Sequence, residues 1–332
     1  MTNPLQPFWD RAPAFILDGG LATELEARGC DLNDPLWSAR LLLENPAAIR
    51  QLHLDYLRAG ADGIITATYQ ASIPGFARKG IPPAQAEDLL RLAVHLALDA
   101  RDAFCATAAQ EDRLRPLVAA SVGPYGAYLA DGSEYRGDYG ISEEALYRFH
   151  RRRWQVLAAS GADLLACETI PSFSEARVLR RLLQETPEAW AWFSFSCRDG
   201  WRISDGTPLS TCAQMLADTE RVAAIGVNCT PPRYIPSLIA ELRRVSDKPI
   251  LVYPNSGEAY HAETRRWSGE NDAARFAALS QTWRQAGARV IGGCCRTGPS
   301  HIAAIRQALQ QPPTDNAFTH RDAKTRTHSY HS

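Results

Sequence analysis

Long apolar runs and an excess of charge of one sign are both missing from this 332-residue sequence. No segment approaches the ~18 apolar residues of a membrane-spanning helix. The N-terminus lacks the basic segment followed by an apolar stretch that marks a signal peptide. The formal net charge of −1 gives no attraction for nucleic acid or an anionic membrane. We therefore expect neither as a partner, and we interpret the one basic run, "HRRRW" at 150–154, as a solvated helix face.

A compact disulfide framework is absent as well. The eight cysteines are dispersed through the chain, which indicates a reducing cytoplasm where thiols pack, react or bind metal. The composition, 45% hydrophobic and 22% charged, is typical of a globular protein with an ample core. Residues 312–332 are polar and nearly free of aliphatic side chains, so we expect a flexible tail after a single domain over 1–311.

One sequence unit is repeated along the chain. The segments "LRAGADGIITATY", "AASGADLLACETI" and "RQAGARVIGGCC" each read as a helix that ends at glycine, followed by an apolar run. Apolar runs without alternation are typical of parallel strands buried on both faces. Eight such strands are predicted, at 15–20, 63–69, 116–123, 163–170, 191–197, 223–229, 249–255 and 289–295.

Strand–helix alternation repeated eight times over ~300 residues predicts an α/β fold, a closed (β/α)₈ TIM-type barrel. An open doubly wound sheet is the alternative, but "DGGLATELEARG" lacks the glycine spacing of a phosphate-binding loop. In a barrel the functional site lies at the carboxyl ends of the strands, and polar or thiol side chains gather there.

Three thiols, those of Cys229, Cys294 and Cys295, end the sixth and eighth predicted strands. Packing cysteines and a strained vicinal disulfide are the alternatives, but a shared metal site is favoured. Zinc prefers thiolates, and three protein ligands leave its fourth tetrahedral position open, as in catalytic sites. A zinc ion held by three thiolates is better suited to bind a substrate thiol as its fourth ligand than to activate water. This ligand set therefore indicates transfer of an alkyl group to the sulfur of the substrate. Cys167 is expected to point away from this site, and the other four cysteines to pack or to lie at the surface.

Two carboxylates, Asp18 and Glu168, end the first and fourth predicted strands. Capping of a turn is the alternative role for Asp18. In a site that binds a thiol, the two would hold a substrate ammonium group, and backbone N–H groups after Gly19-Gly20 would receive its carboxylate. These features together fit an amino acid that carries a thiol.

The sequence resembles the zinc-dependent homocysteine S-methyltransferases. The motifs "DGGLATELEARG", "GADGIITATYQAS", "SVGPYGAYLADGSEY", "ETIPSFSEA", "GVNCTPP", "VYPNSGE" and "GGCCRTGP" follow in the family's order over residues ~15 to ~310. The resemblance is greatest to the stand-alone branch that uses S-methylmethionine. It implies one zinc on Cys229, Cys294 and Cys295, and homocysteine contacts from Asp18, Glu168, Tyr69, Thr169 and Asn228.

The expected activity is direct methyl transfer from a sulfonium donor to the homocysteine thiolate, which forms methionine. Tyrosines 125, 128, 135, 139 and 260 and Trp267 are candidates for contact with the cationic donor, with loop anchoring as the alternative. The open alternatives are betaine, S-adenosylmethionine or another onium donor, selenocysteine as acceptor, and a non-catalytic zinc- or redox-sensing protein. A monomer or small homo-oligomer is expected.

Overall fold

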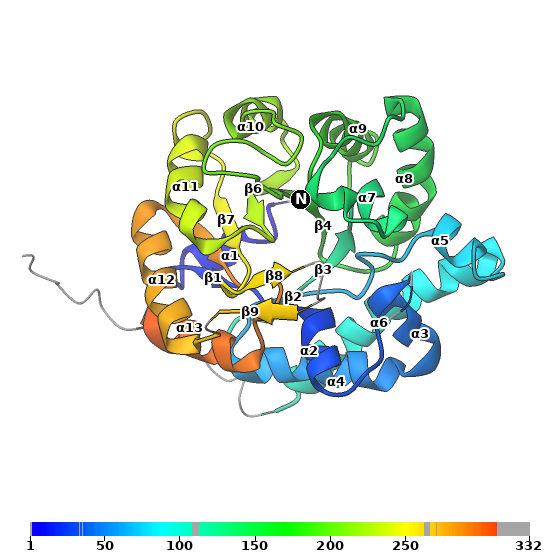
Figure 1. Ribbon diagram of the computed structural model, residues 1–332. Coiled ribbons are helices and arrows are strands. Elements are labelled where there is room, and N and C mark those ends of the chain that lie inside the picture. The colour runs from blue at the N-terminus through cyan, green and yellow to red at the C-terminus, as the bar shows by residue number, and fades with distance from the viewer. Residues whose placement is uncertain are drawn as a thin grey trace, which may run out of the picture.

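The computed structural model describes residues 2–32, 34, 36–107, 113–261, 266–269 and 271–310. Within this part of the chain, eight parallel strands form one sheet in the order β1-β10-β7-β6-β5-β4-β3-β2, and helices surround it (Figure 1). A parallel bridge between Leu17 and Gly63 joins the two end strands. The sheet therefore closes, and the predicted (β/α)₈ barrel is confirmed. The strands are β1 Phe15–Ile16, β2 Gly63–Ile65, β3 Leu117–Val122, β4 Leu164–Ile170, β5 Ala191–Phe195, β6 Val222–Asn228, β7 Ile250–Tyr253 and β10 Ala288–Ile291.

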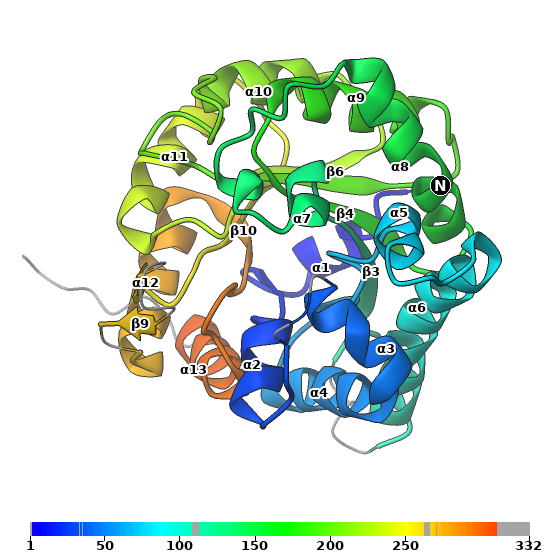
Figure 2. The same cartoon turned by 45° about the vertical axis from the view of Figure 1, so that its right-hand side comes forward.

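Helices follow the strands and form the outer ring, which Figure 2 shows from a second direction. A short antiparallel hairpin, β8 (Ala259–His261) with β9 (Arg266–Ser268), is inserted after β7. The helices are α1 Gln6–Trp9, α2 Leu21–Ala27, η1 Trp37–Arg40, α3 Leu41–Glu44, α4 Pro46–Ala59, α5 Ile73–Ala77, α6 Pro83–Cys105, α7 Tyr125–Leu129, η3 Ser133–Tyr135, α8 Glu143–Ala158, α9 Phe173–Gln184, α10 Leu209–Ala217, η4 Pro232–Tyr234, α11 Ile235–Arg243, α12 Ala273–Ala286 and α13 Pro299–Gln310.

Local signals at the helix ends explain why the chain turns where it does. The side chains of Asn45 and Ser142 accept hydrogen bonds from Ala48 N and Ala145 N, which caps α4 and α8. Gly60 and Gly287 end α4 and α12 with φ values of 115° and 119°, a left-handed conformation that glycine adopts without a steric penalty. The repeated glycine of the sequence unit is thus the joint between helix and strand.

The barrel interior is packed with apolar side chains from the inner faces of the strands. Phe15, Leu164, Trp192 and Leu251 are among them, all at most 3% exposed. Phe8 of α1 stacks edge-on against Phe15 with ring centroids 4.8 Å apart, so α1 covers the amino end of the barrel. This apolar filling leaves only the carboxyl end of the barrel for polar chemistry.

The basic run at 150–154 is less exposed to solvent than we expected from the sequence. Arg151 and Arg152 are exposed, but His150 and Arg153 are buried. His150 Nε2 lies 2.7 Å from Glu175 Oε1 of α9, and Arg153 donates hydrogen bonds to the Gly123 and Ala71 carbonyls. A solvated face is therefore wrong for three of the five residues, His150, Arg153 and Trp154. Glu175 gives His150 a buried partner that the local sequence does not reveal.

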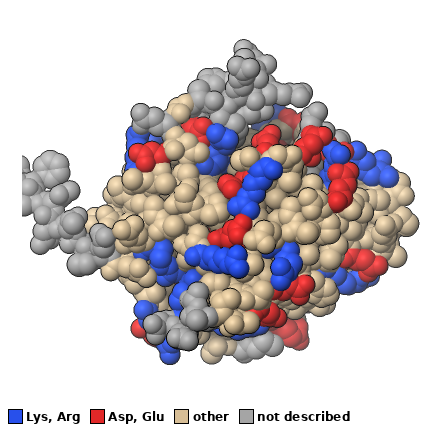
Figure 3. Space-filling view, turned by 90° about the horizontal axis from the view of Figure 1, so that it is seen from below, with Lys and Arg blue, Asp and Glu red and all other residues tan. Residues whose placement is uncertain are grey.

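The outer surface mixes charges of both signs. On the face that Figure 3 shows, Lys and Arg side chains are interspersed with Asp and Glu, and neither sign covers the face alone. No helix in the described part of the chain is both long enough and apolar enough to cross a membrane. The predicted flexible tail, 312–332, lies outside the described residues.

Candidate active site and metal centre

The three cysteines predicted as metal ligands come together at the carboxyl end of the barrel. The sulfur atoms of Cys229, Cys294 and Cys295 all lie within 4.8 Å of one another, and Cys229 Sγ is 3.6 Å from Cys295 Sγ. Sulfurs around a tetrahedral zinc with bonds of ~2.3 Å are about 3.8 Å apart. The spacing of the cluster therefore fits a single zinc-sized ion.

The ionisation of these thiols also fits a cation. Hydrogen bonds from Cys294 and Cys295 hold the pKa of the Cys229 thiol well below its usual range. The same hydrogen bonds to Cys229 raise the pKa of Cys294 and of Cys295. The protein alone thus favours one thiolate, and three together require a positive ion to offset their repulsion.

The loop that carries Cys294 and Cys295 is held on both sides. Toward β7, Cys294 N donates to Pro254 O at 2.8 Å and Cys295 N donates to Asn255 Oδ1 at 3.2 Å. Toward β1, Gly20 N donates to Thr297 O at 2.8 Å. A Cβ on Gly20 would stand 2.4 Å from Cys294 O, so glycine is required for this approach. This packing fixes the position of both sulfurs.

Glu168 lies at the centre of a polar layer above the apolar barrel interior. Its Oε1 accepts a hydrogen bond from Ser121 Oγ, and its Oε2 accepts one from Tyr253 OH at 3.3 Å. Tyr253 OH in turn pairs with Ser194 Oγ. Glu168 is 7% exposed, and burial raises its pKa to about 7, with the neighbouring Cys229 a smaller cause. A cationic substrate group beside it would favour the ionised carboxylate.

Asp18 lies at the seam where the barrel closes. Its Oδ2 accepts a hydrogen bond from Ile65 N at 2.8 Å, and its backbone N donates to Gly63 O. Its side chain therefore joins the two strands at the seam, which is a different structural role from the turn capping considered in the sequence. Burial raises the pKa of Asp18 well above its usual range, and the charge of Glu168 raises it further. The two carboxylates are therefore close enough to repel each other.

Three further residues were predicted to contact the substrate, namely Gly19, Gly20 and Tyr69. Gly19 and Gly20 pack against the loop that carries the cysteines, and Gly20 N–H is already bonded to Thr297 O rather than free for a ligand. Tyr69 follows β2 and is partly exposed, and burial of its hydroxyl raises its pKa.

Thr169 and Asn228 form a reciprocal pair. Thr169 N donates to Asn228 Oδ1, and Asn228 Nδ2 donates to Thr169 Oγ1, both at 2.7 Å. Asn228 is fully buried, and Thr169 has a φ of 56°, which is strained for a β-branched residue. Asn228 therefore positions Thr169 and holds it in this conformation.

Asn228→Ala should destabilise the protein by about 2–4 kcal/mol, because it leaves the Thr169 amide buried without a partner and removes the hydrogen bonds that offset the strained backbone of Thr169. The free energy of unfolding in urea measures this. Thr169→Gly in the same background should recover part of the loss, since glycine adopts positive φ freely. A loss below ~0.5 kcal/mol for Asn228→Ala would contradict the positioning role.

Among the aromatic candidates for donor contact whose side chains the structure describes, Tyr135 reaches the cysteines. Tyr135 OH lies 3.3 Å from Cys229 Sγ, and this tyrosine is 50% exposed. Tyr125 and Tyr128 stack with Phe149, while Tyr139 donates to Glu175 Oε2 at 2.9 Å. These three are loop anchors in the structure. The side chains of Tyr260 and Trp267 lie outside the described residues.

Several site residues were not identified from sequence. Ser194 and Tyr253 support Glu168 from β5 and β7, and Glu134 of η3 lies near Cys229. The sequence could have identified them only by predicting which alternate residues of each strand face the barrel interior. That prediction depends on the register between neighbouring strands. Cys167, as expected, packs in the core outside the barrel rather than in the site.

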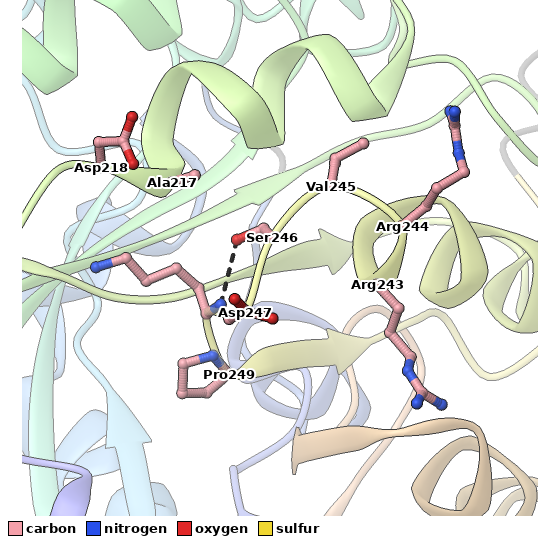
Figure 4. Close-up of a pocket in the computed structure, with 9 residues that line it drawn as sticks. Ala217, Asp218, Arg243, Arg244, Val245, Ser246, Asp247 and Pro249 are labelled. Carbon is pink, nitrogen blue, oxygen red and sulfur yellow. Dashed lines mark hydrogen bonds between the residues drawn. The ribbon is translucent and has the colours of Figure 1, made fainter.

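The surface pocket of Figure 4 is far from this chemistry. It is lined by residues at the ends of α10 and α11 and by the segment that leads into β7, including Arg243, Ser246 and Pro249. It lies at the amino end of β7, whereas Cys229 follows the carboxyl end of β6. The pocket therefore belongs to the opposite end of the barrel from the cysteines.

Comparison with known proteins agrees with the site. A family model described as homocysteine S-methyltransferase matches residues 15–309. Homocysteine S-methyltransferase YbgG of Bacillus subtilis is 54% identical and covers 91% of this chain and 96% of its own. The homocysteine S-methyltransferase of Escherichia coli is 51% identical, over 92% of this chain and 98% of its own.

Solved structures of the homocysteine methyltransferase MmuM from Escherichia coli are similar throughout. The metallated form has a TM-score of 0.83 and 50% identity, over 92% of this chain and 99% of its own. An apo form has also been solved, with a TM-score of 0.75. On the family match and on relatives that are about half identical over nearly their full length, the chain belongs to the homocysteine S-methyltransferase family.

Proposed function

We propose that this protein transfers a methyl group from S-methylmethionine to homocysteine and so forms methionine. The observation that carries the proposal is the cluster of Cys229, Cys294 and Cys295 beside two buried carboxylates at the mouth of the barrel. The relatives named as homocysteine S-methyltransferases support it. An amino acid that carries a thiol matches both parts of this site, because its sulfur suits the cysteine cluster and its ammonium group suits the carboxylates.

The three cysteines are proposed to hold one zinc ion, which the sulfur spacing and the thiol donors fit. When bound, zinc would lower the pKa of the homocysteine thiol, so that its sulfur reacts as thiolate at neutral pH. Asp18 and Glu168 would bind the homocysteine ammonium group. Thr169, held by Asn228, and Tyr69 would line the same pocket.

The reaction needs no further chemical group from the protein. The homocysteine sulfur forms a bond to the methyl carbon as the bond from that carbon to the sulfonium sulfur breaks. The bonding pair stays on the donor sulfur, which becomes a neutral thioether, and the thiol proton is released to solvent. The contribution of the chain is to hold the two sulfurs in line with the methyl group.

A donor panel tests the proposal. Purified protein with homocysteine should form methionine from S-methylmethionine, and its kcat/KM with S-adenosylmethionine and with betaine should be lower. A preference for betaine, or for selenocysteine over homocysteine as acceptor, would replace the donor or acceptor assignment. A protein that forms no methyl thioether with any donor and cycles a disulfide instead would overturn the proposal.

The reduced thiols that this chemistry requires also support a cytoplasmic location. Each cysteine is a free thiol in the structure, and the three at the site would be lost to disulfide exchange in an oxidising compartment. We propose further that residues 1–311 form one domain, with 312–332 as an appended tail.

A further inference from the structure

Glu134 lies at the mouth of the barrel in a position that the structure fixes firmly. It belongs to η3 (Ser133–Tyr135), which follows α7 inside the ring of outer helices (Figure 2). The next residue, Tyr135, reaches Cys229 Sγ with its hydroxyl at 3.3 Å. The Glu134 carbonyl accepts a hydrogen bond from Ser196 Oγ at 3.0 Å, which ties this segment to the end of β5.

The carboxylate of Glu134 is incompletely paired. Its Oε2 is buried and has no hydrogen-bond partner among the described residues. Burial raises the pKa of Glu134 to about 7. Arg136, a cation whose charge acts on Glu134, is bonded to Asp131 and Ser133. A buried carboxylate oxygen without a partner is costly, so its retention at a site mouth indicates a ligand that supplies the missing partner.

The surroundings of Glu134 define the kind of ligand. Its charge lies close enough to Tyr69 and Tyr139 to raise the pKa of each hydroxyl, and close enough to Cys229 to interact with that thiol. A carboxylate that lies near tyrosine hydroxyls and beside the cysteine cluster suits an organic cation. The homocysteine ammonium already has Asp18 and Glu168, which are 2% and 7% exposed within the barrel.

We propose that Glu134 binds the positive charge of the methyl donor and thereby selects a cationic sulfonium substrate. This inference rests on the proposed function. The methyl group passes in line between two sulfurs, so the donor must lie beside the homocysteine sulfur and therefore near the cysteine cluster that Glu134 adjoins. S-methylmethionine carries two positive groups, its sulfonium and its α-ammonium, and either would provide the cation that Oε2 lacks.

The kinetic signature follows from the charge change in the reaction. The donor sulfur is positive before transfer and neutral after it, so a carboxylate beside it stabilises the bound donor at least as much as the transition state. A contact with the α-ammonium would be the same in both states. In either case loss of the charge should raise the donor KM and leave kcat nearly unchanged.

Glu134→Gln tests this in the metal-loaded enzyme. We expect the KM for S-methylmethionine to rise about 10- to 100-fold, as for loss of a buried charged contact. The KM for homocysteine and the metal content should stay at wild-type values. Asp138→Asn is the matched control, because Asp138 is an exposed carboxylate on the same loop and should leave the donor KM unchanged.

A second donor separates the two sources of positive charge. With a dimethyl alkyl sulfonium that lacks the α-ammonium, an equal rise in KM assigns Glu134 to the sulfonium, whereas an unchanged KM assigns it to the ammonium. A Glu134→Gln enzyme that keeps the wild-type KM for S-methylmethionine overturns the inference and leaves the proposed function standing. A wild-type enzyme that neither binds a sulfonium by calorimetry nor consumes one overturns both.

Discussion

Cys229→Ser should abolish metal binding and lower the kcat/KM for methyl transfer at least about 10³-fold. Without a metal, a homocysteine thiol of pKa ~8.5 is only a few per cent ionised at pH 7, which accounts for about 30-fold. Loss of the fixed position of the nucleophilic sulfur accounts for the remainder. Cys229 is the proposed ligand that follows β6, so its removal leaves only the two cysteines of one loop.

Metal content and activity are measured together for this prediction. Elemental analysis should give about one zinc per wild-type chain and less than about a tenth of that for Cys229→Ser. Cys105→Ser is the matched control, since Cys105 is a partly buried cysteine at the end of α6, away from the cluster. A Cys229→Ser protein that retains zinc would remove Cys229 from the proposed ligand set.

Glu168→Gln should lower the kcat/KM for homocysteine about 10²- to 10³-fold and at the same time stabilise the metal-free protein above pH 7. Glutamine keeps an oxygen for Ser121 and a polar group for Tyr253, so the variant removes mainly the charge. Loss of one partner from a buried ion pair with the substrate ammonium has an effect of this size.

The stability effect follows from the raised pKa of Glu168, about 7 in the folded protein against 4.5 for an ordinary glutamate. Between these values the folded state binds more protons than the unfolded state, so the free energy of unfolding falls as pH rises. Above pH 7 the ionised, buried Glu168 lowers the free energy of unfolding of the wild type by up to about 3 kcal/mol. Glutamine does not titrate, so the Glu168→Gln variant does not have this free-energy cost.

Denaturation of both chelator-treated proteins at pH 4.5 and pH 8 measures this difference. The gain of Glu168→Gln over the wild type should be largest at pH 8 and nearly vanish at pH 4.5. Ser210→Ala, remote from Glu168 on α10, should show no such dependence on pH. An equal effect at both pH values would mean that packing, rather than charge, is altered.

The sequence by itself determined the eight strands, the helices between them and the positions at which chemistry is placed. Those features are local: a buried parallel strand needs an unbroken apolar run, and a helix that ends in a left-handed turn needs glycine, as at Gly60 and Gly287. Cys229, Cys294, Cys295 and Glu168 could be assigned to strand ends for the same reason. Their convergence then follows from closure of the barrel.

Only the tertiary structure decided which side chains meet. Ser121 and Tyr253 support Glu168 because three strands align at one level, and a one-residue change of register would turn each side chain to the other face. Burial of His150 beside Glu175 joins two helices whose separate sequences show only a charged run and a capping acid. The same holds for Glu134, because an unpaired carboxylate can be recognised only after every neighbour that could pair with it has been placed.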